Sequence, residues 1–382
     1  MNKKLKILIS AITLLLVGGI GTSFYGEKAT EKIDIASSES RQGVGRAAKE
    51  DGAGGRVGKE TYPFVTEMFD SVMVKNILPL GELNGGYEEA STITGLMIIT
   101  KSDLSEKPDL EVRAPADMTL SAYSYHKYRQ EPEAWRLSFM MDENLIITLD
   151  HIARVSQRIM QNTTTAPKSD SSDQYPKEKI EIKKGEVIGY TIGKGRTKSF
   201  NLYFHDKRTN NAFINQERFK ERGQRYLTAS CVVDYYEKSI QDKLIPLLGY
   251  DEPGQTPVCN KVTRDVKGTL SGMWFLDKEG LESKYDGSYA SPFSIFLSSA
   301  NEVILYEINR KRSILGRTNP TFKDPAQVTD SHCYSLQDYS DSPRKGYAYF
   351  KIVSETEMKM AFSADGSCPS AFPESQSKTY YR

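Results

Sequence analysis

The chain has 382 residues, which is long enough for two domains at roughly 150 residues each. Its 51 Lys and Arg against 50 Asp and Glu leave almost no net charge, so charge gives no reason to expect nucleic acid or an anionic membrane surface as a partner. Aromatic residues reach 10% of the chain, which is ample for packed cores and argues against a disordered protein.

Residues 1–26 have the pattern of an export signal. A basic start, MNKKLK, precedes the apolar run ILISAITLLLVGGIG, which ends in small residues. A cleaved signal peptide and an uncleaved signal anchor both fit this pattern, although the run is shorter than the roughly 20 residues usual for a membrane span. Either interpretation places the rest of the chain outside the cytoplasm, secreted or anchored only through this segment.

Residues 27–62 are rich in glycine, serine and charged residues and lack apolar periodicity. A segment of this kind buries too little apolar surface to order itself. We therefore expect a flexible linker, with the folded part of the chain beginning near Phe64.

Short apolar runs separated by turn residues predict a first β domain over residues 63–226. TGLMIIT is typical of a buried strand, and WRLSFMM, DEN and LIITL together predict a hairpin with a polar turn. The segments IEIKKGEVIGYTIGKG and SFNLYFHD predict further strands, and the Ser- and Thr-rich residues 162–177 between them and the hairpin predict a surface loop.

The order of the segments in this domain resembles that of the lysostaphin-type zinc endopeptidases. The segments are PLGELN, VRAPADMTLSAY, WRLSFMMDENLIITLDHIARV, KKGEVIGYTIGKG and FNLYFHD, and the resemblance covers residues 72–208. It implies an antiparallel β structure called the duplicated hybrid motif. It also implies a site at which His151, Asn201 and Tyr203 converge.

The zinc site that the resemblance implies is not retained. The family is expected to hold zinc with a His and an Asp from an early motif and with the second His of an HxH strand, leaving one position for water. In this chain the early motif falls in LGELNGGYEEASTITG, where Glu88 or Glu89 offers one carboxylate and Ile93 or a neighbour replaces another ligand. Asn201 and Tyr203 occupy the two positions of the HxH strand, so we expect no zinc and no other cofactor.

Two of the four histidines follow predicted strands. His151 ends the segment LIITLDH and matches a family histidine that does not bind zinc. A purely structural role, as a strand-end histidine bonded to a carbonyl, is favoured over retained binding or surviving catalysis. His205 and Asp206 end FNLYFHD, and such a pair can bind a cation or act as an acid–base couple, although a solvated strand end is commoner. The candidate binding residues are His151, Asn201, Tyr203, His205 and Glu88.

A second domain is expected over residues 227–382. Val233, Tyr236, Ile240 and Leu244 recur at helical spacing and predict one leading helix. The segments TLSGMWFL, PFSIFLSSANEVILYEI and GYAYFKIVSETEMKMAFS predict strands of a small antiparallel β barrel or sandwich. The pattern GTxxGxWF resembles a C-terminal β module of uncharacterised exported proteins, in which Trp274 would enter the core.

The four cysteines all lie in this second predicted domain, and none has the CxxC spacing of a zinc site. Two disulfides formed in an oxidising compartment are the simplest interpretation. Of the three possible connectivities, the one local in sequence is favoured, pairing Cys231 with Cys259 and Cys333 with Cys368.

These patterns predict a mainly β, exported protein that binds or scaffolds cell-wall or surface glycan or peptide without cleaving it. The ligand class follows from family analogy alone. The alternative is a metal-dependent hydrolase, similar to peptidoglycan endopeptidases, in which other residues replace the usual ligands.

Overall fold

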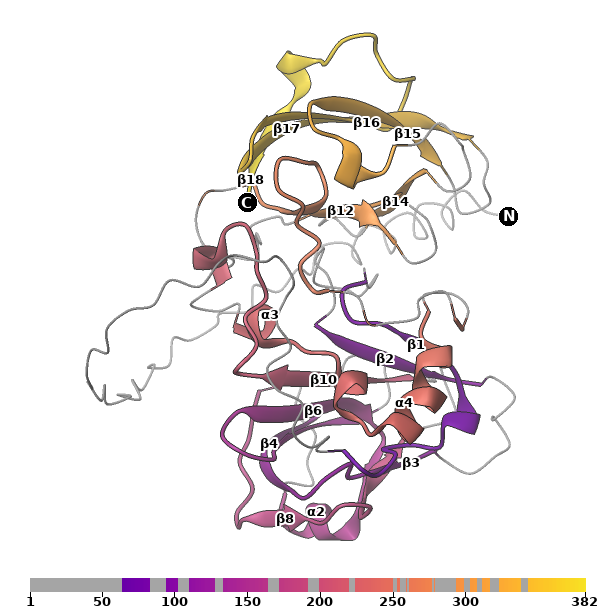
Figure 1. The fold of residues 1–382 in the computed structure, drawn as a ribbon, viewed down its shortest axis with the longest axis vertical. Helices are drawn as coiled ribbons and strands as arrows, with labels where there is room; N and C mark the ends of the chain where they lie inside the picture. Colours follow the sequence, from indigo (N-terminus) through magenta and orange to yellow (C-terminus); the bar gives the residue numbers. More distant parts are fainter. Residues whose placement is uncertain are drawn as a thin grey trace, which may run out of the picture. The chain divides into compact units, whose positions relative to one another are not determined.

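Figure 1 shows the computed structural model. It describes residues 64–82, 94–101, 110–127, 133–163, 172–191, 199–219, 224–249, 253–254, 259, 261–276, 278, 293–298, 303–307, 311–316, 323–337 and 343–382. The expected signal segment, the linker and Glu88 lie outside these ranges. Within them, no helix is both long enough and apolar enough to cross a membrane.

The described chain is mainly β and its neighbouring strands pair antiparallel, which confirms the predicted fold class. A seven-stranded sheet contains, in spatial order, β1 (Val74–Leu78), β2 (Gly95–Thr100), β10 (Ser199–Asp206), β6 (Leu145–Ile152), β5 (Ala134–Met140), β4 (Met118–His126) and β8 (Ile180–Ile182). A small sheet contains β3 (Leu110–Arg113), β9 (Val187–Thr191) and β7 (Arg154–Val155). Figure 1 draws both in indigo to magenta.

One face of the seven-stranded sheet is the core of this part of the chain. Along β10 the burial of side chains alternates strictly, because successive strand residues point to opposite faces. Phe200, Leu202 and Phe204 are at most 1% exposed, whereas the residues between them are half-buried. The second face is therefore available for polar side chains.

Short helices complete this core. They are η1 (Ser71–Met73), α2 (Gln157–Gln161), η3 (Gln216–Phe219), α3 (Gln224–Thr228), η4 (Val232–Tyr235), α4 (Lys238–Leu244) and η5 (Ile245–Leu247). The predicted helix is present as α4, flanked by η4 and η5. Its assignment to a second domain that begins at residue 227 needs correction, because Tyr236, Ile240 and Leu244 pack in the same hydrophobic cluster as the seven-stranded sheet. Their apolar stripe is buried against that sheet, so the helix completes the first core instead of opening a second domain.

The remaining strands follow one another in chain order in a single sheet. They are β11 (Gly272–Trp274), β12 (Phe293–Leu297), β13 (Val303–Glu307), β14 (Lys311–Gly316), β15 (Ser331–Gln337), β16 (Pro343–Ser354), β17 (Glu357–Ser363) and β18 (Lys378–Tyr381), with η6 (Pro325–Gln327) and η7 (Glu374–Gln376) between strands. Phe275 and Tyr381 exchange two backbone hydrogen bonds of 2.7 Å, which join the first strand to the last. We call β11–β18 the closed sheet. Because its first and last strands are hydrogen-bonded, it is a barrel and not a sandwich, the other architecture expected from the sequence.

The interior of the closed sheet is filled around Trp274, which is fully buried as its sequence pattern predicted. Its indole N–H donates to the carbonyl of Leu270 at 2.9 Å. The guanidinium of Arg382 lies 4.2 Å from the centre of its ring system and donates to the carbonyl of Ser271 at 2.9 Å. Gly272, with φ of +141°, lets the chain pass where a Cβ would lie 2.3 Å from Asp265 Oδ1.

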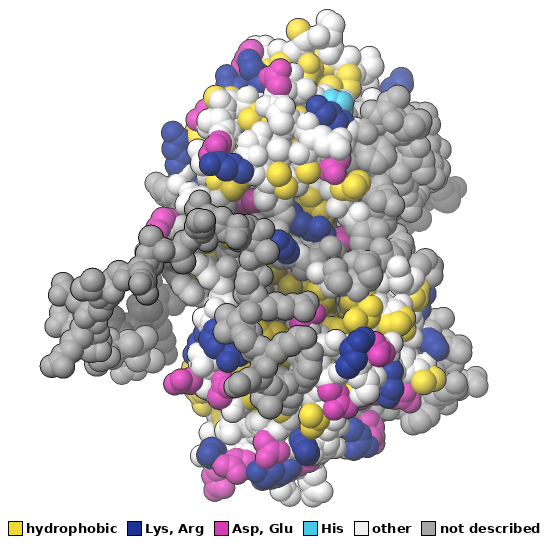
Figure 2. Space-filling model, viewed as in Figure 1, with side chains coloured by type: hydrophobic (Ala, Val, Ile, Leu, Met, Phe, Trp, Pro, Cys, Tyr) yellow, Lys and Arg dark blue, Asp and Glu magenta, His cyan; other side chains and the backbone are white. Residues whose placement is uncertain are grey.

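Both expected disulfides are present, Cys231–Cys259 and Cys333–Cys368. Such bonds suit an oxidising, extracytoplasmic environment. The expectation that both lie in the C-terminal domain needs correction, because Cys231 is buried in the core of the seven-stranded sheet and Cys259 packs against that core. Figure 2 shows basic and acidic side chains interspersed on the visible face, in line with the balanced charge of the sequence.

Candidate functional site

A β-bulge in β6 determines where His151 points. The register between β5 and β6 shifts between Leu149 and Ile152, so Asp150 and His151 together oppose Arg136. Leu149 and Ile152 are fully buried in the core, and the two residues between them are both half-buried. The extra residue therefore brings His151 to the half-exposed face, as bulges do when they redirect a side chain.

The backbone of His151 adopts a conformation that only a few non-glycine residues tolerate. Its φ is 64°, and it is the one non-glycine residue with positive φ among those the structure describes. Its backbone N–H donates to Asp150 Oδ1 at 2.8 Å. The ring itself has no hydrogen bond to the described residues, so the carbonyl partner expected for a strand-end histidine is not found there.

Strand pairing brings the other family positions to the same face. Asn201 lies opposite Asp150, and Tyr203 lies opposite Thr148. Directly paired residues of antiparallel strands point to the same side of a sheet. Asn201 and Tyr203 therefore point to one side of the sheet, and the amide of Asn201 donates to the phenol oxygen of Tyr203 at 3.3 Å. His151 lies in the bulge next to Asp150, the partner of Asn201.

The position of Tyr203 depends on a glycine in the neighbouring strand. Gly95 of β2 pairs with Tyr203, and a Cβ built on Gly95 would lie 2.7 Å from Tyr203 Cδ1 and 2.6 Å from the carbonyl oxygen of Leu202. A real Cβ essentially never lies within 3.0 Å of another heavy atom in this way. Glycine therefore allows the phenol ring to lie directly against the backbone of β2.

We define the polar face as the side of the seven-stranded sheet that lies opposite the core and carries Asn201 and Tyr203. Its members are Ser124, Arg136, Ser138, Thr148, Asp150, His151, Asn201, Tyr203 and His205. Ser138 and Thr148 are paired across β5 and β6, and their hydroxyl oxygens lie 2.9 Å apart.

His205 lies on the polar face but far from His151. Its partner Ile146 is five residues from His151 along β6, roughly 17 Å at the rise of an antiparallel strand. The two imidazoles are therefore not neighbours. They cannot share one metal ion or one proton, because a metal–nitrogen bond is only about 2 Å long.

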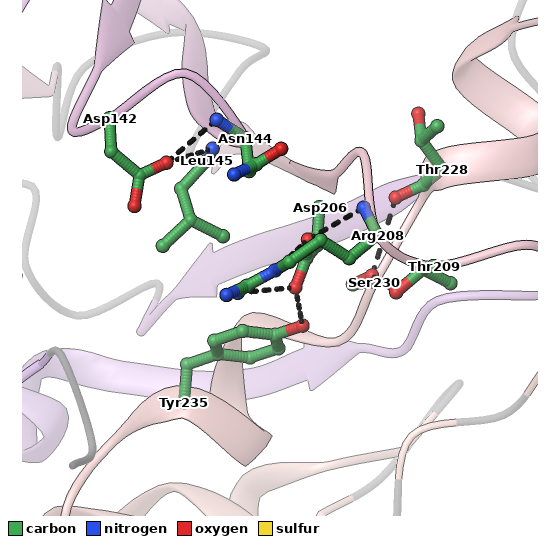
Figure 3. A network of polar contacts seen from close by, with 9 residues as sticks. All are labelled: Asp142, Asn144, Leu145, Asp206, Arg208, Thr209, Thr228, Ser230 and Tyr235. Carbon is green, nitrogen blue, oxygen red and sulfur yellow. Dashed lines mark hydrogen bonds and ion pairs between the residues drawn. The ribbon is translucent and has the colours of Figure 1, made fainter. Parts of the chain in front are cut away.

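Asp206 does not act with His205, because adjacent strand residues point to opposite faces. The carboxylate of Asp206 lies on the core side and binds Arg208 through Nε at 2.8 Å and Tyr235 through its hydroxyl at 2.7 Å (Figure 3). Burial raises the pKa of Asp206, but the hydrogen bonds from Arg208 and Tyr235 outweigh burial and leave it below its usual value. The His–Asp couple, which was the less favoured interpretation of the sequence, is not formed; Asp206 instead binds Arg208 and Tyr235.

The environment of His205 determines its tautomer and its charge. Its Nδ1 lies 3.3 Å from Thr228 Oγ1, and that hydroxyl donates its single proton to the carbonyl of Gln224 at 2.9 Å. When the hydroxyl donates to that carbonyl, its oxygen accepts from Nδ1–H, and this tautomer leaves a lone pair on Nε2. Burial, followed by the positive charges of Arg225 and Arg136, lowers the pKa of His205 to about 4, so the ring is neutral at pH 7.

Arg136 is a functional candidate that sequence analysis missed. Its Nε is buried and has no hydrogen-bond partner within the described residues, and its guanidinium forms no ion pair there. The alternation in WRLSFM, where Arg136 and Ser138 interrupt apolar positions, was the available signal. Alternation identifies the face of the sheet, but not which polar residues meet across strands.

Within the described residues, no cluster of three or more His, Cys, Asp or Glu side chains could hold a metal ion. Residues 83–93 of the early family motif, with Glu88 and Glu89, lie outside them, so the expectation of no zinc stays a prediction. No protein family, curated protein or solved structure matches this chain. The relation to the lysostaphin-type endopeptidases accordingly stays a proposal, argued below from the residues.

Proposed function

We propose that the protein is an extracytoplasmic binding protein whose polar face holds peptide or glycan of the cell wall or cell surface, and that it does not cleave this ligand. The observation that carries the proposal is the pairing of β6 and β10, which puts Asn201 and Tyr203 on the side of the sheet opposite the core and His151 in the bulge beside Asp150, the partner of Asn201. These are the positions at which the sequence resembles a peptidase site.

The chemistry of the three side chains supports binding over hydrolysis. An amide and a phenol exchange hydrogen bonds with peptide and sugar groups, but neither is a usual zinc ligand. Among the described residues, His151 is the imidazole nearest along the chain to Asp150, the partner of Asn201, and His205 is too distant to assist it. The two disulfides support an extracytoplasmic location for such a ligand.

Co-sedimentation of the purified full chain with insoluble peptidoglycan tests this function. We expect the wild type to pellet with the polymer, and Asn201→Ala and Tyr203→Ala to stay in the supernatant. Lys359→Ala is the matched control, because Lys359 is a partly exposed residue of the closed sheet, paired with Glu374 at 2.8 Å. Pelleting of both polar-face variants at the wild-type level, with melting curves that show them folded, would contradict the proposal.

Zinc content separates binding from the hydrolase alternative. Catalytic zinc requires three protein ligands of nitrogen, oxygen or sulfur type, whereas positions 201 and 203 carry Asn and Tyr. We expect elemental analysis of protein purified without chelator to find no stoichiometric zinc, and peptidoglycan or glycine-rich peptides to stay intact. One zinc per chain, lost on chelation together with a hydrolytic activity, would establish the alternative instead.

A further inference from the structure

Two residues of opposite charge lie across from each other on the polar face. Arg136 of β5 lies opposite the bulge of β6 that holds Asp150 and His151, and Asp150 pairs with Asn201 of β10. Each of Arg136, Asp150 and Asn201 follows a buried residue of its own strand and so points to the side opposite the core. A guanidinium, a carboxylate and an amide thus form one row across three neighbouring strands, which we call the charged row.

The guanidinium of Arg136 is not used within the fold. Its Nε is shielded from solvent and has no hydrogen-bond partner among the described residues, and no carboxylate there forms an ion pair with it. A guanidinium stays charged and carries five N–H donors, and burying such donors without acceptors is unfavourable. A ligand that supplied acceptors would remove this penalty.

The carboxylate of Asp150 is used only in part. Its Oδ1 accepts the backbone N–H of His151 at 2.8 Å. Within the described part of the chain its second oxygen accepts no hydrogen bond, and the carboxylate forms no ion pair, although Arg136 lies across from it on the next strand. The two opposite charges are therefore neighbours on the sheet that do not bind each other.

A ligand with a single charge does not suit the charged row. An anion bound to Arg136 would lie near the carboxylate of Asp150, and a cation bound to Asp150 would lie near the guanidinium of Arg136. Like charges brought together in this way disfavour binding. A ligand that carries both charges, in contrast, meets an opposite charge at each of the two positions.

The third member of the charged row is neutral. The side-chain N–H of Asn201 donates to Tyr203, and its amide oxygen accepts no hydrogen bond from the described residues. This oxygen can accept an N–H of a ligand that is bound at Asp150, the partner of Asn201.

We propose that the charged row binds a zwitterionic amino-acid group, a carbon that carries both an ammonium and a carboxylate. This inference rests on the proposed binding function and names the chemistry of its ligand. The planar fork of Arg136 matches the two oxygens of the ligand carboxylate. The second oxygen of Asp150 accepts one N–H of the ligand ammonium, and the amide oxygen of Asn201 accepts another.

The test uses the purified full chain and three small probes, titrated at neutral pH and constant ionic strength. Racemic alanine carries both charges, propionate carries the negative charge alone, and ethylamine carries the positive charge alone. The readout is the NMR signal of the Asn201 side-chain amide, with that of the Arg136 Nε–H beside it. We expect saturable shifts with alanine, and binding of propionate and of ethylamine that is weaker by roughly tenfold or more.

Two variants should change the ligand preference in opposite directions. Asp150→Asn keeps an acceptor for the His151 N–H and removes the negative charge, so alanine should bind roughly tenfold more weakly and propionate more tightly than to the wild type. Arg136→Gln removes the positive charge, so alanine should again bind roughly tenfold more weakly, but ethylamine more tightly. A merely structural role of either residue would not exchange one preference for another.

Two control variants remove the same charges elsewhere. Arg158→Gln removes an exposed arginine that pairs with Glu186 at 3.2 Å, next to β9 of the small sheet. Asp242→Asn removes an exposed carboxylate that pairs with Lys238 on α4. Both variants should bind the three probes as the wild type does.

Three results would overturn the inference. They are the absence of a saturable shift with alanine in folded wild-type protein, binding of propionate or ethylamine as tight as that of alanine, and an unchanged alanine affinity in both Asp150→Asn and Arg136→Gln. The peptidoglycan assay separates these failures from failure of the proposed function. Peptidoglycan binding without alanine binding would leave the function standing and remove the zwitterion site. Alanine binding without peptidoglycan binding would keep the site and remove the cell-wall ligand.

Discussion

His205 is a neutral imidazole held between a hydroxyl and two positive charges. Thr228 fixes its Nδ1 tautomer, and burial together with Arg225 and Arg136 lowers its pKa to about 4. Its charge state follows from these neighbours, since an exposed histidine has a pKa near 6.5. The same neighbours make it a sensitive reporter of any ligand that changes the local charge.

The stability of the first sheet should depend on pH through His205. Because the folded pKa lies below the unfolded value of about 6.5, the unfolded chain binds the proton first, so stability is lost as pH falls from about 6.5 to 4. The loss is on the order of 3 kcal/mol for His205. Hydrogen exchange at the amides of β10, measured across this range, should show a flatter dependence in His205→Gln. A ring that titrates near 6.5 in the folded wild type would contradict this expectation.

His151 combines a solvent-facing ring with a left-handed backbone conformation. Such a conformation costs a non-glycine residue on the order of 1 kcal/mol. Its occurrence at one of the predicted site positions is therefore a reason to ask whether the ring is retained for binding.

Substitutions of His151 should rank by backbone tolerance. We expect His151→Ala to change the free energy of unfolding by no more than about 1 kcal/mol, because the ring has no hydrogen bond to the described residues. His151→Gly should raise stability by roughly 0.5–1 kcal/mol, since glycine adopts φ of +64° freely. His151→Val should be the least stable, because β-branched residues tolerate positive φ poorly. Equal stability of the Gly and Val variants in denaturant unfolding would disprove the assigned conformation.

At the scale of elements, β2 and β6 shape the polar face by two different means. In β6 the bulge at Asp150 and His151 adds a side chain to the face. In β2 the missing side chain of Gly95 leaves room for the ring of Tyr203. Both are backbone features, and together they position the ring and the imidazole before any ligand is present.

Gly95→Ala should disturb the site and the sheet together. The new methyl group would meet both Tyr203 Cδ1 and the Leu202 carbonyl at under 3 Å, and overpacking of this kind costs about 1–3 kcal/mol. Gly268→Ala is the control: nothing lies within 4 Å of a Cβ built there, so the only cost of the substitution is the positive φ of +72°. In Gly95→Ala, both the stability measured by denaturant unfolding and the affinity for peptidoglycan should fall, whereas Gly268→Ala should keep wild-type binding. Wild-type binding and stability in Gly95→Ala would refute the close packing.

At the scale of the whole molecule, two separate hydrophobic clusters organise the described chain, and β11 contributes to both. Met273 and the following Phe275 belong to the cluster of the first sheet, whereas Trp274 between them belongs to the closed sheet. Strand alternation explains this division, because neighbouring residues of β11 face opposite sides. Arg382 secures the same strand by covering Trp274.

Arg382→Ala should destabilise the closed sheet selectively. The guanidinium is almost fully buried, lies 4.2 Å from the Trp274 ring centre and donates to the carbonyls of Ser271 and Glu355. Removing this contact and leaving the carbonyls unpaired should lower the free energy of unfolding of the closed sheet by about 2–4 kcal/mol. The two tryptophans allow a clean readout: in a Trp135→Phe background, Trp274 fluorescence reports unfolding of the closed sheet alone. Lys359→Ala, at an exposed ion pair, should shift that transition by less than about 1 kcal/mol.

The sequence by itself determined the elements whose signals are local. Apolar runs located many of the strands, although β1, β14, β15 and β18 were not predicted. The four clustered cysteines led to the correct pairing, and the pattern around Trp274 marked a buried anchor. These properties depend on a residue and its near neighbours, so they can be read along the chain.

Only the tertiary structure decided which residues meet. The helix near Ile240 joined the first core because an apolar stripe packs wherever a complementary face lies, and the sequence does not say where that is. The bulge that turns His151 outward depends on one residue of register between β5 and β6. The lowered pKa of His205 depends on its burial and on the charges of Arg225 on α3 and Arg136 on β5, which come from other elements. Register and strand order are set by contacts between distant segments, which is why the charge of the polar face emerged only from the folded chain.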